Sequence, residues 1–160
     1  GYIRSYLPGI RENGGQYTHA GVWLAMGCLI SGMEQEGWEL LRAMLPFGRD
    51  DSVFKTEPYV ITADVNSNKQ KIGRGGWSWY TGAAGWYNRV AVEELLGIRV
   101  RGGILTVTPR LPREWDGFSA LYKTDHAEIA IKVKRGAQSS HPDGINLSLA
   151  RGKIEMVAGG

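Results

Sequence analysis

The sequence contains little cysteine and no apolar run long enough to cross a membrane. Cys28 is the one cysteine, which excludes an internal disulfide, and its neighbours Gly27 and Leu29 predict a buried thiol of the kind found in reducing compartments. The apolar run from Val22 to Ile30 is too short for a bilayer span, which takes about 20 residues. We therefore expect a cytoplasmic region without direct membrane insertion, on the cytoplasmic side of any membrane-bound parent.

Histidine is scarce as well, and charge of neither sign is concentrated in one place. His19 has no second histidine or cysteine close in sequence, and His126 and His141 are unsuitably spaced, so we expect no metal site. The net charge is +3 and the basic residues are spread out, which argues against nucleic acid but is compatible with a small anion. A nucleophile elbow and a phosphate-binding P-loop are both absent.

The first part of the chain predicts helices of two kinds. Residues 16–33 form a helix that is apolar nearly all round and is therefore expected to be buried. Residues 35–45 have a single apolar face, and residues 78–96 form a third helix. A buried helix followed by a surface helix is expected of a double-layered helical barrel. The intervening residues 46–77 form a long connection of a kind that often carries function.

The pattern changes near Gly97. Apolar and polar side chains alternate with a period of two over residues 128–134 and again at 145–149, and residues 102–109 and 117–123 are further strand candidates. The predicted fold class is therefore α followed by β. We place the boundary between residues 1–97, the last helices and active-site loops of a barrel, and residues 98–160, a β-sandwich-like domain.

The start of the sequence suggests that it is a piece of a larger protein. The sequence opens with GYIRSY and has no initiator methionine. A helix with so few polar positions must also be covered on several sides. We therefore expect a fragment whose exposed helices are covered by the rest of a parent barrel or by another chain.

A polar segment, RENGGQYTHAG over residues 11–21, stands directly before the apolar part of the first helix. A helix start needs a cap but not this many polar groups, so the segment is either a solvated turn or the rim of a site. Glu12 could act as a general base, accept a hydrogen bond from a sugar hydroxyl or be a surface carboxylate. His19 beside an apolar helix is more often a hydrogen-bonded core residue than a catalyst.

The start of the third helix, at Thr81 and Gly82, is a second candidate. Free N–H groups and the positive end of a helix dipole could bind an oxyanion there, with His19 as a further donor. The competing interpretation, a plain helix cap, is the commoner one. Three tryptophans lie near this helix start: Trp77, Trp79 and Trp86. They could stack on sugar rings or pack in a core.

Inverting hydrolysis of a glycoside needs a carboxylic acid and a second group that activates water. Glu12 could fill one of these roles. The other carboxylates considered, Asp50, Asp51 and Asp64, lie in loop-like sequence and are expected to be solvated. The residues alone therefore leave the second carboxylate of such a pair unassigned.

Four segments in order resemble one enzyme family: GIRENGGQYTHAGVWLAM, EPYV, GRGGWSWYTGAAGW and PRLPREWDGF. Across residues 1–125 the sequence is similar to the C-terminal part of cellobiose-phosphorylase-type glycoside phosphorylases. It is most similar to the phosphorylase-like C-terminal region of cyclic β-1,2-glucan synthases. The resemblance implies an (α/α)6 barrel followed by a β-sandwich-like piece. It also implies inverting phosphorolysis without a cofactor, in which inorganic phosphate as co-substrate makes the second carboxylate unnecessary.

The resemblance also assigns roles to individual residues. His19, Thr81 and the backbone of Gly82 match the family's phosphate ligands, and Tyr6 and Glu12 match its sugar-contacting residues. The family's general-acid Asp and its arginine phosphate ligands belong upstream, so no catalytic residue is expected in this chain. Where cellobiose phosphorylases have a glutamine after EPYV, Ala63 stands here, which favours a β-1,2-glucan over cellobiose.

The leading hypothesis is a fragment of a module that cleaves β-glucan by inverting phosphorolysis, releases glucose 1-phosphate and so controls chain length in a cyclic β-1,2-glucan synthase. On this hypothesis the parent is an enzyme, while the chain alone is inactive because it lacks the general acid. The expected partners are a β-glucan oligosaccharide and phosphate. One alternative is an inverting glucosidase in which Glu12 activates water; another is a non-catalytic carbohydrate-binding remnant.

Overall fold

The computed structural model describes residues 1–79 and 82–160, which form a mixed α/β structure. The chain divides into two compact units. One comprises Gly1–Cys28 and Glu36–Val90, and the other comprises Leu29–Gln35 and Ala91–Gly160. The predicted boundary at residue 97 remains a prediction.

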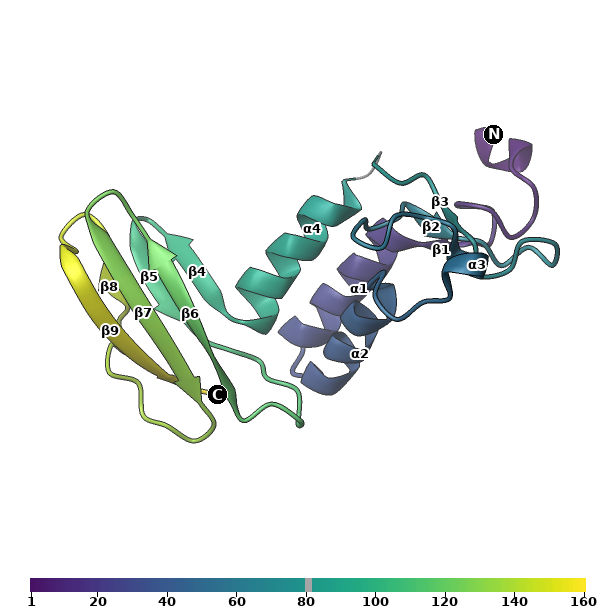
Figure 1. The fold of residues 1–160 in the computed structure, drawn as a ribbon. Helices are drawn as coiled ribbons and strands as arrows, with labels where there is room; N and C mark the ends of the chain where they lie inside the picture. The colour runs from purple at the N-terminus through teal and green to yellow at the C-terminus, as the bar shows by residue number, and fades with distance from the viewer. Residues whose placement is uncertain (80–81) are drawn as a thin grey trace. The chain divides into compact units, whose positions relative to one another are not determined.

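The helices of the first unit follow the predicted order (Figure 1). They are α1 (Thr18–Ile30), which ends beyond this unit, α2 (Glu34–Met44), the short α3 (Asp51–Phe54) and α4 (Ala83–Arg89). A short 3-10 helix, η1 (Tyr2–Ser5), precedes them, and the π-helical η2 (Val90–Leu95) continues α4, with all but its first residue in the second unit. The first two helices are confirmed to within three residues.

The third helix begins later than the predicted residue 78. Trp77 and Trp79 have backbone φ angles of 53° and 68°, in the left-handed region that an α-helix does not use. The first described helical residue after them is Ala83. The predicted start is therefore wrong by five residues, because the left-handed backbone at Trp77 and Trp79 cannot belong to an α-helix.

Side chains from three helices hold the first unit together. The Tyr87 hydroxyl of α4 donates to the Leu41 carbonyl of α2 at 3.0 Å. A Cβ added at Gly21 of α1 would lie 2.9 Å from Sδ of Met44 in α2, so the glycine permits close packing of these two helices. Leu41 is wholly buried in this packing.

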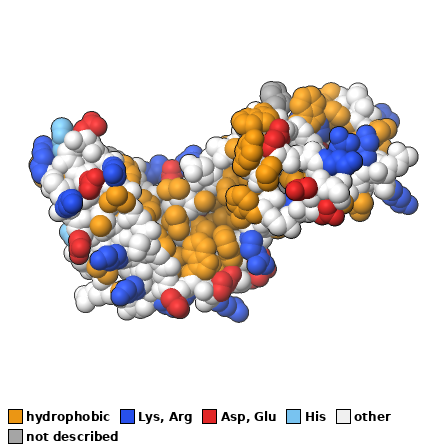
Figure 2. All heavy atoms as spheres, in the orientation of Figure 1, with side chains coloured by type: hydrophobic (Ala, Val, Ile, Leu, Met, Phe, Trp, Pro, Cys, Tyr) orange, Lys and Arg blue, Asp and Glu red, His pale blue; other side chains and the backbone are white. Residues whose placement is uncertain are grey.

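The prediction that α1 is buried all round is wrong within this chain. Val22, Ala25 and Leu29 are fully buried. Trp23 and Leu24 are more than half exposed, at 51% and 59%, and hydrophobic side chains are visible on the surface of this part of the molecule (Figure 2). The thiol of Cys28, also expected to be buried, is only half-buried. The described residues therefore cover this helix on one side only.

A small antiparallel sheet ties the long connection to the start of α1. Its strands have two residues each: β1 (Gln16–Tyr17), β2 (Asp64–Val65) and β3 (Gly75–Gly76). They pair in the order β1-β2-β3. Tyr17 pairs with Asp64, and Asp64 pairs with Gly76. This sheet places residues of the connection beside the polar segment that precedes α1.

The second unit contains two further three-stranded sheets. The first has the order β4-β5-β8, formed by Ile98–Arg101, Ile104–Val107 and Ile145–Asn146. The second has the order β6-β7-β9, formed by Gly117–Lys123, Ala127–Lys134 and Gly152–Gly159. Strands β6 and β7 are antiparallel, whereas β7 and β9 are parallel.

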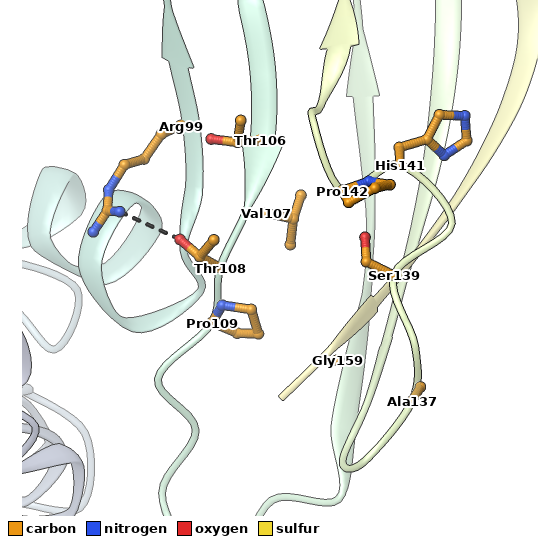
Figure 3. A pocket seen from close by; sticks show the side chains of 10 residues that line it. All are labelled: Arg99, Thr106, Val107, Thr108, Pro109, Ala137, Ser139, His141, Pro142 and Gly159. Atoms are coloured by element: carbon orange, nitrogen blue, oxygen red, sulfur yellow. Dashed lines mark hydrogen bonds between the residues drawn. The ribbon is translucent and has the colours of Figure 1, made fainter.

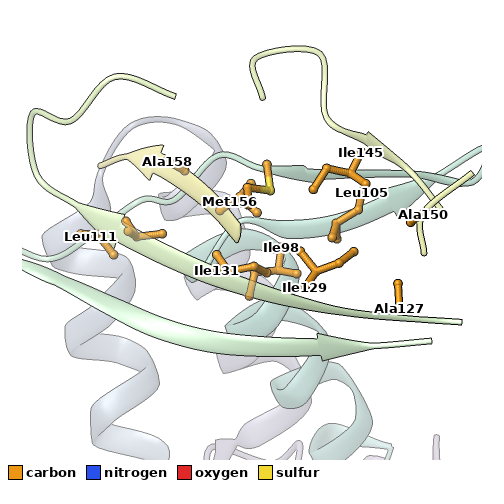
Figure 4. Packing of buried hydrophobic residues seen from close by; sticks show 12 residues of the cluster. Ile98, Leu105, Leu111, Ala127, Ile129, Ile131, Ile145, Ala150, Met156 and Ala158 are labelled. Carbon is orange, nitrogen blue, oxygen red and sulfur yellow. The ribbon is translucent and has the colours of Figure 1, made fainter. Parts of the chain in front are cut away.

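Both sheets contribute to one hydrophobic cluster (Figure 4). Leu105 of β5, Ile129 and Ile131 of β7, and Met156 of β9 are at most 1% exposed within it. The alternation predicted for residues 128–134 is confirmed, because the apolar side chains of β7 face this cluster. The strand predicted to continue to residue 149 is wrong: β8 ends at Asn146, and Leu149 is 75% exposed.

Candidate functional site

The polar segment before α1 is folded into a tight loop. The Gly9 N–H donates to the Asn13 carbonyl at 2.7 Å, and the Gly15 N–H donates to the Arg11 carbonyl at 2.9 Å. A Cβ at Gly15 would lie 2.8 Å from the Arg11 nitrogen, so this position requires glycine. The segment is thus an ordered loop with its own hydrogen bonds.

Arg11 is the centre of this loop, and the sequence alone did not reveal its role. Its guanidinium carbon lies 5.3 Å from the centre of the Tyr6 ring and 4.9 Å from that of Trp77. Its Nε is 3.6 Å from Oε2 of Glu12, and the two side chains are only 12% and 23% exposed. The structure therefore brings together Tyr6 and Glu12, both predicted to contact sugar, around an arginine that contacts each of them.

Asp64 supports the same loop from β2. It is fully buried, so the prediction that it is solvated is wrong. Its Oδ2 accepts a hydrogen bond from the Arg11 N–H at 2.9 Å, and Oδ1 has no partner among the described residues. A Cβ at Gly76 would be 2.6 Å from Oδ1, which shows that the pairing of β2 and β3 leaves space for this carboxylate only beside a glycine.

The other two aspartates considered have a structural role. Asp50 caps α3 by accepting from the Ser52 N–H at 2.8 Å, and Asp51 is in the first turn. Hydrogen bonds from the side chain and then the backbone of Ser52 lower the pKa of Asp50. Both carboxylates are exposed, as predicted.

His19 lies in the first turn of α1 beside two indole rings that also contact each other. Its ring centre is 4.9 Å from that of Trp23, edge to face, and 6.1 Å from that of Trp86. Its Nε2 is buried and has no hydrogen-bond partner among the described residues. The hydrogen-bonded core role considered for His19 therefore does not describe this side chain, because aromatic contacts hold the ring while a polar nitrogen is left unpaired.

Gly82 stands next to the His19 ring. A Cβ added to it would be 3.7 Å from Cε1 and 3.8 Å from Nδ1 of the imidazole. Gly82 is the N-cap residue of α4 and makes no side-chain cap hydrogen bond. Thr81, the third predicted phosphate ligand, lies outside the described residues. The structure thus brings together His19 and Gly82, which are far apart in the sequence.

The three tryptophans near α4 have different environments. Trp86 packs against Trp23 at 5.4 Å between ring centres, whereas Trp77 lies beside Arg11. Trp79 is 72% exposed and donates its indole N–H to Oε1 of Glu57 at 2.9 Å. The backbone N–H of Glu57 and then this indole lower the pKa of the Glu57 carboxyl. Only Trp86 has the packing role expected from its place on a helix.

The second unit offers a different cavity, of about 610 Å³ (Figure 3). Among its lining residues, Arg99 donates to the Thr108 hydroxyl and forms an ion pair with Glu94, and His141 contacts the Ser140 hydroxyl at 2.8 Å. Its charged and titratable groups are thus already paired. This cavity is a weaker candidate than the region around His19.

Residues 1–79 and 82–160 contain neither a cluster of metal ligands nor a helix that could span a membrane. No three His, Cys, Asp or Glu side chains there come together as metal ligands. None of the helices in this part of the chain combines the length and apolar character that a membrane crossing requires.

Comparison with known proteins defines the class. Residues 1–97 match the catalytic domain of the glycosyl hydrolase 94 superfamily. Because this match covers more than half of the chain, the chain belongs to that superfamily. The predicted family resemblance is confirmed, and the loop, His19 and Gly82 all lie within the matched residues.

Three individual proteins are similar to this chain. The chain is 43% identical, over 98% of its length, to the cyclic beta-(1,2)-glucan synthase NdvB of Rhizobium meliloti. It is 26% identical, over 91% of its length, to an N,N'-diacetylchitobiose phosphorylase of Vibrio furnissii. It is 27% identical, over its full length, to a 3-O-beta-D-glucopyranosyl-beta-D-glucuronide phosphorylase of Paenibacillus borealis. The chain spans 6%, 18% and 20% of the lengths of these three relatives.

Proposed function

We propose that this chain forms one side of the active site of a module that cleaves β-1,2-glucan by inverting phosphorolysis and releases glucose 1-phosphate. In a cyclic β-1,2-glucan synthase this reaction controls chain length. The observation that carries the proposal is the pairing of His19, with its buried and unpaired Nε2, with the adjacent Gly82 at the start of α4. The superfamily match and the similarity to phosphorylases and a glucan synthase support it.

The proposed reaction assigns a phosphate-binding role to this side of the site. His19 donates from Nε2 to one phosphate oxygen, and the Gly82 N–H and Thr81 bind another. A third phosphate oxygen attacks the anomeric carbon from the face opposite the leaving group. The bond to the glycosidic oxygen breaks, and that oxygen takes a proton from an aspartic acid contributed by the parent outside this chain. No cofactor takes part.

Tyr6 and Glu12 act on the sugar side. Glu12 is only 23% exposed and accepts from sugar hydroxyls, while the half-buried Tyr6 contributes its ring and hydroxyl. A carboxylate with an aromatic neighbour suits a sugar ring, because the ring has apolar C–H faces and polar hydroxyl edges. Ala63, in place of a glutamine, favours β-1,2-glucan over cellobiose.

The parent module completes the fold in this proposal. The remaining helices of an (α/α)6 barrel cover the exposed side of α1, including Trp23 and Leu24, and residues 98–160 form a β-sandwich-like domain. We place the module on the cytoplasmic side, because Cys28 is a free thiol and thiols stay reduced in that compartment. The 160-residue chain alone is inactive, since the general acid is missing.

The experiment uses the full-length protein that contains this chain. Purified enzyme is incubated with β-1,2-glucan with and without phosphate, and glucose 1-phosphate and glucose are measured separately. His19→Ala is expected to raise the KM for phosphate more than it weakens the affinity for glucan, whereas the matched control His126→Ala, an exposed histidine of the second unit, leaves both unchanged. Equal losses of phosphate and glucan affinity in His19→Ala would show a structural role instead.

A further inference from the structure

We propose that Arg11 is a positioning residue that fixes Tyr6 and Glu12 for the glucan, and that Asp64 holds Arg11 in place. This inference rests on the proposed function, because it concerns the sugar side of the same site. Neither residue was expected to have this role from the sequence. Three contacts carry the inference: the guanidinium against two rings, the ion pair with Glu12, and the buried acceptor beneath the Arg11 backbone.

The side chain of Arg11 links Tyr6 and Glu12, the two residues proposed to contact the sugar. Its guanidinium lies near both the Tyr6 ring and the Trp77 ring, at distances typical of cation–π contacts. Its Nε and Oε2 of Glu12 are both buried, and neither has a hydrogen-bond partner among the described residues. The two atoms lie 3.6 Å apart, which is ion-pair distance.

The backbone of Arg11 is held in a conformation that an arginine seldom adopts. Its φ angle is 49°, in the left-handed region, which costs free energy for a residue with a side chain. The hydrogen bond from its N–H to Oδ2 of the fully buried Asp64 offsets this cost. The sheet register that places Asp64 opposite Gly76 therefore also determines where the Arg11 side chain begins.

Together these contacts form a continuous support for the loop. Asp64 fixes the Arg11 backbone, and the Arg11 side chain orients Tyr6 and Glu12. Binding sites gain affinity when neighbouring groups fix their side chains before the ligand arrives. A change at Arg11 is therefore expected to weaken glucan binding while leaving the phosphate side, at His19 and Gly82, intact.

The test compares Arg11→Gln with Arg4→Gln in the full-length enzyme. Arg4 is an exposed arginine of η1 and serves as the matched control. Arg11→Gln is expected to raise the KM for β-1,2-glucan about 10-fold, with the KM for phosphate within about twofold and the melting temperature little changed. Arg11→Lys keeps the charge but not the planar group that contacts two rings, so it is expected to retain only part of the affinity that Arg11→Gln loses.

The role of Asp64 is tested by comparing a conservative variant, Asp64→Asn, with Asp64→Ala. Asp64→Asn keeps an oxygen that accepts from the Arg11 N–H and is expected to retain a glucan KM within about twofold of wild type, whereas Asp64→Ala raises it as Arg11→Gln does. An unchanged glucan KM in Arg11→Gln would overturn the proposal. A parallel rise of both KM values with a lower melting temperature would overturn it too, by showing a purely structural role.

Calorimetry separates this proposal from the proposed function. If the wild-type enzyme releases no glucose 1-phosphate, phosphorolysis is refuted, but glucan binding can still be measured by titration. A dissociation constant for β-1,2-glucan about 10-fold weaker in Arg11→Gln than in Arg4→Gln would then still support the positioning role. Equal affinities would refute it independently of any turnover.

Discussion

Gly82→Ala tests the phosphate side of the site with the smallest possible change. The φ angle of Gly82 is −72°, which alanine adopts without strain. The added methyl carbon would lie 3.7 Å from Cε1 and 3.8 Å from Nδ1 of His19, at ordinary contact distance. The substitution therefore leaves the fold intact but fills the space beside the imidazole where a phosphate oxygen is proposed to bind.

Alanine keeps the backbone N–H of residue 82, but its methyl group displaces the phosphate oxygen, so the expected effect is that of losing one hydrogen bond to a charged ligand. Such a bond contributes about 1.5–3 kcal/mol, which corresponds to roughly 10–100-fold in affinity. We therefore expect the KM for phosphate to rise about 10–100-fold, with a much smaller change in the KM for glucan. The assay is the initial rate of glucose 1-phosphate release by the full-length enzyme as a function of phosphate concentration.

Gly85→Ala is the matched control. It makes the same change three residues further along α4, where an added Cβ meets no atom within 4 Å. Because glycine inside a helix is unfavourable, this variant is expected to be about 0.5–1 kcal/mol more stable with unchanged phosphate kinetics. Equal KM values for phosphate in the two variants would refute the placement of phosphate beside His19 and Gly82.

Three further predictions concern stability and can be checked by denaturant unfolding. Ile131→Ala, at a position 1% exposed in the core of the second unit, should cost about 2–5 kcal/mol, and a loss below 1 kcal/mol would contradict the packing described. Asp50→Ala removes the cap on the Ser52 N–H and should lower the stability measurably, whereas no loss would show that α3 needs no cap. Tyr87→Phe removes the hydrogen bond to Leu41 and should cost about 1 kcal/mol near neutral pH. Burial raises the pKa of Tyr87 from 10.0 to about 12, so the folded state holds this proton more tightly. The stabilisation is therefore complete below pH 10.0 and is lost as the pH rises towards about 12, a dependence that the Phe variant should lack.

Elements with a clear period could be predicted from the sequence. The single apolar face of α2 and the alternation along β7 each follow from side-chain spacing, and both elements are present. The strands β1 and β3 could not be found this way, because two residues contain no period. The left-handed backbone at Trp77 and Trp79 likewise has no signal in side-chain spacing, and it delays the start of α4.

The site was only partly predictable, because some of its contacts join segments that are far apart in the sequence. His19 and Gly82 were singled out by their chemistry and by resemblance, and the structure places them side by side. Arg11 gave no such signal, since its contact with Trp77 depends on how a distant segment folds back. Asp64 was misjudged as solvated because its burial comes from pairing with Tyr17 and Gly76 rather than from neighbours in sequence.

The most direct test of the central claim is the product formed from β-1,2-glucan by the full-length enzyme, followed by phosphorus NMR. Inverting phosphorolysis of a β-linkage predicts α-glucose 1-phosphate, formed only when phosphate is present. It also predicts a far slower reaction for His19→Ala at limiting phosphate. Release of free glucose without phosphate, or no sugar phosphate from a well-folded enzyme, would contradict the account.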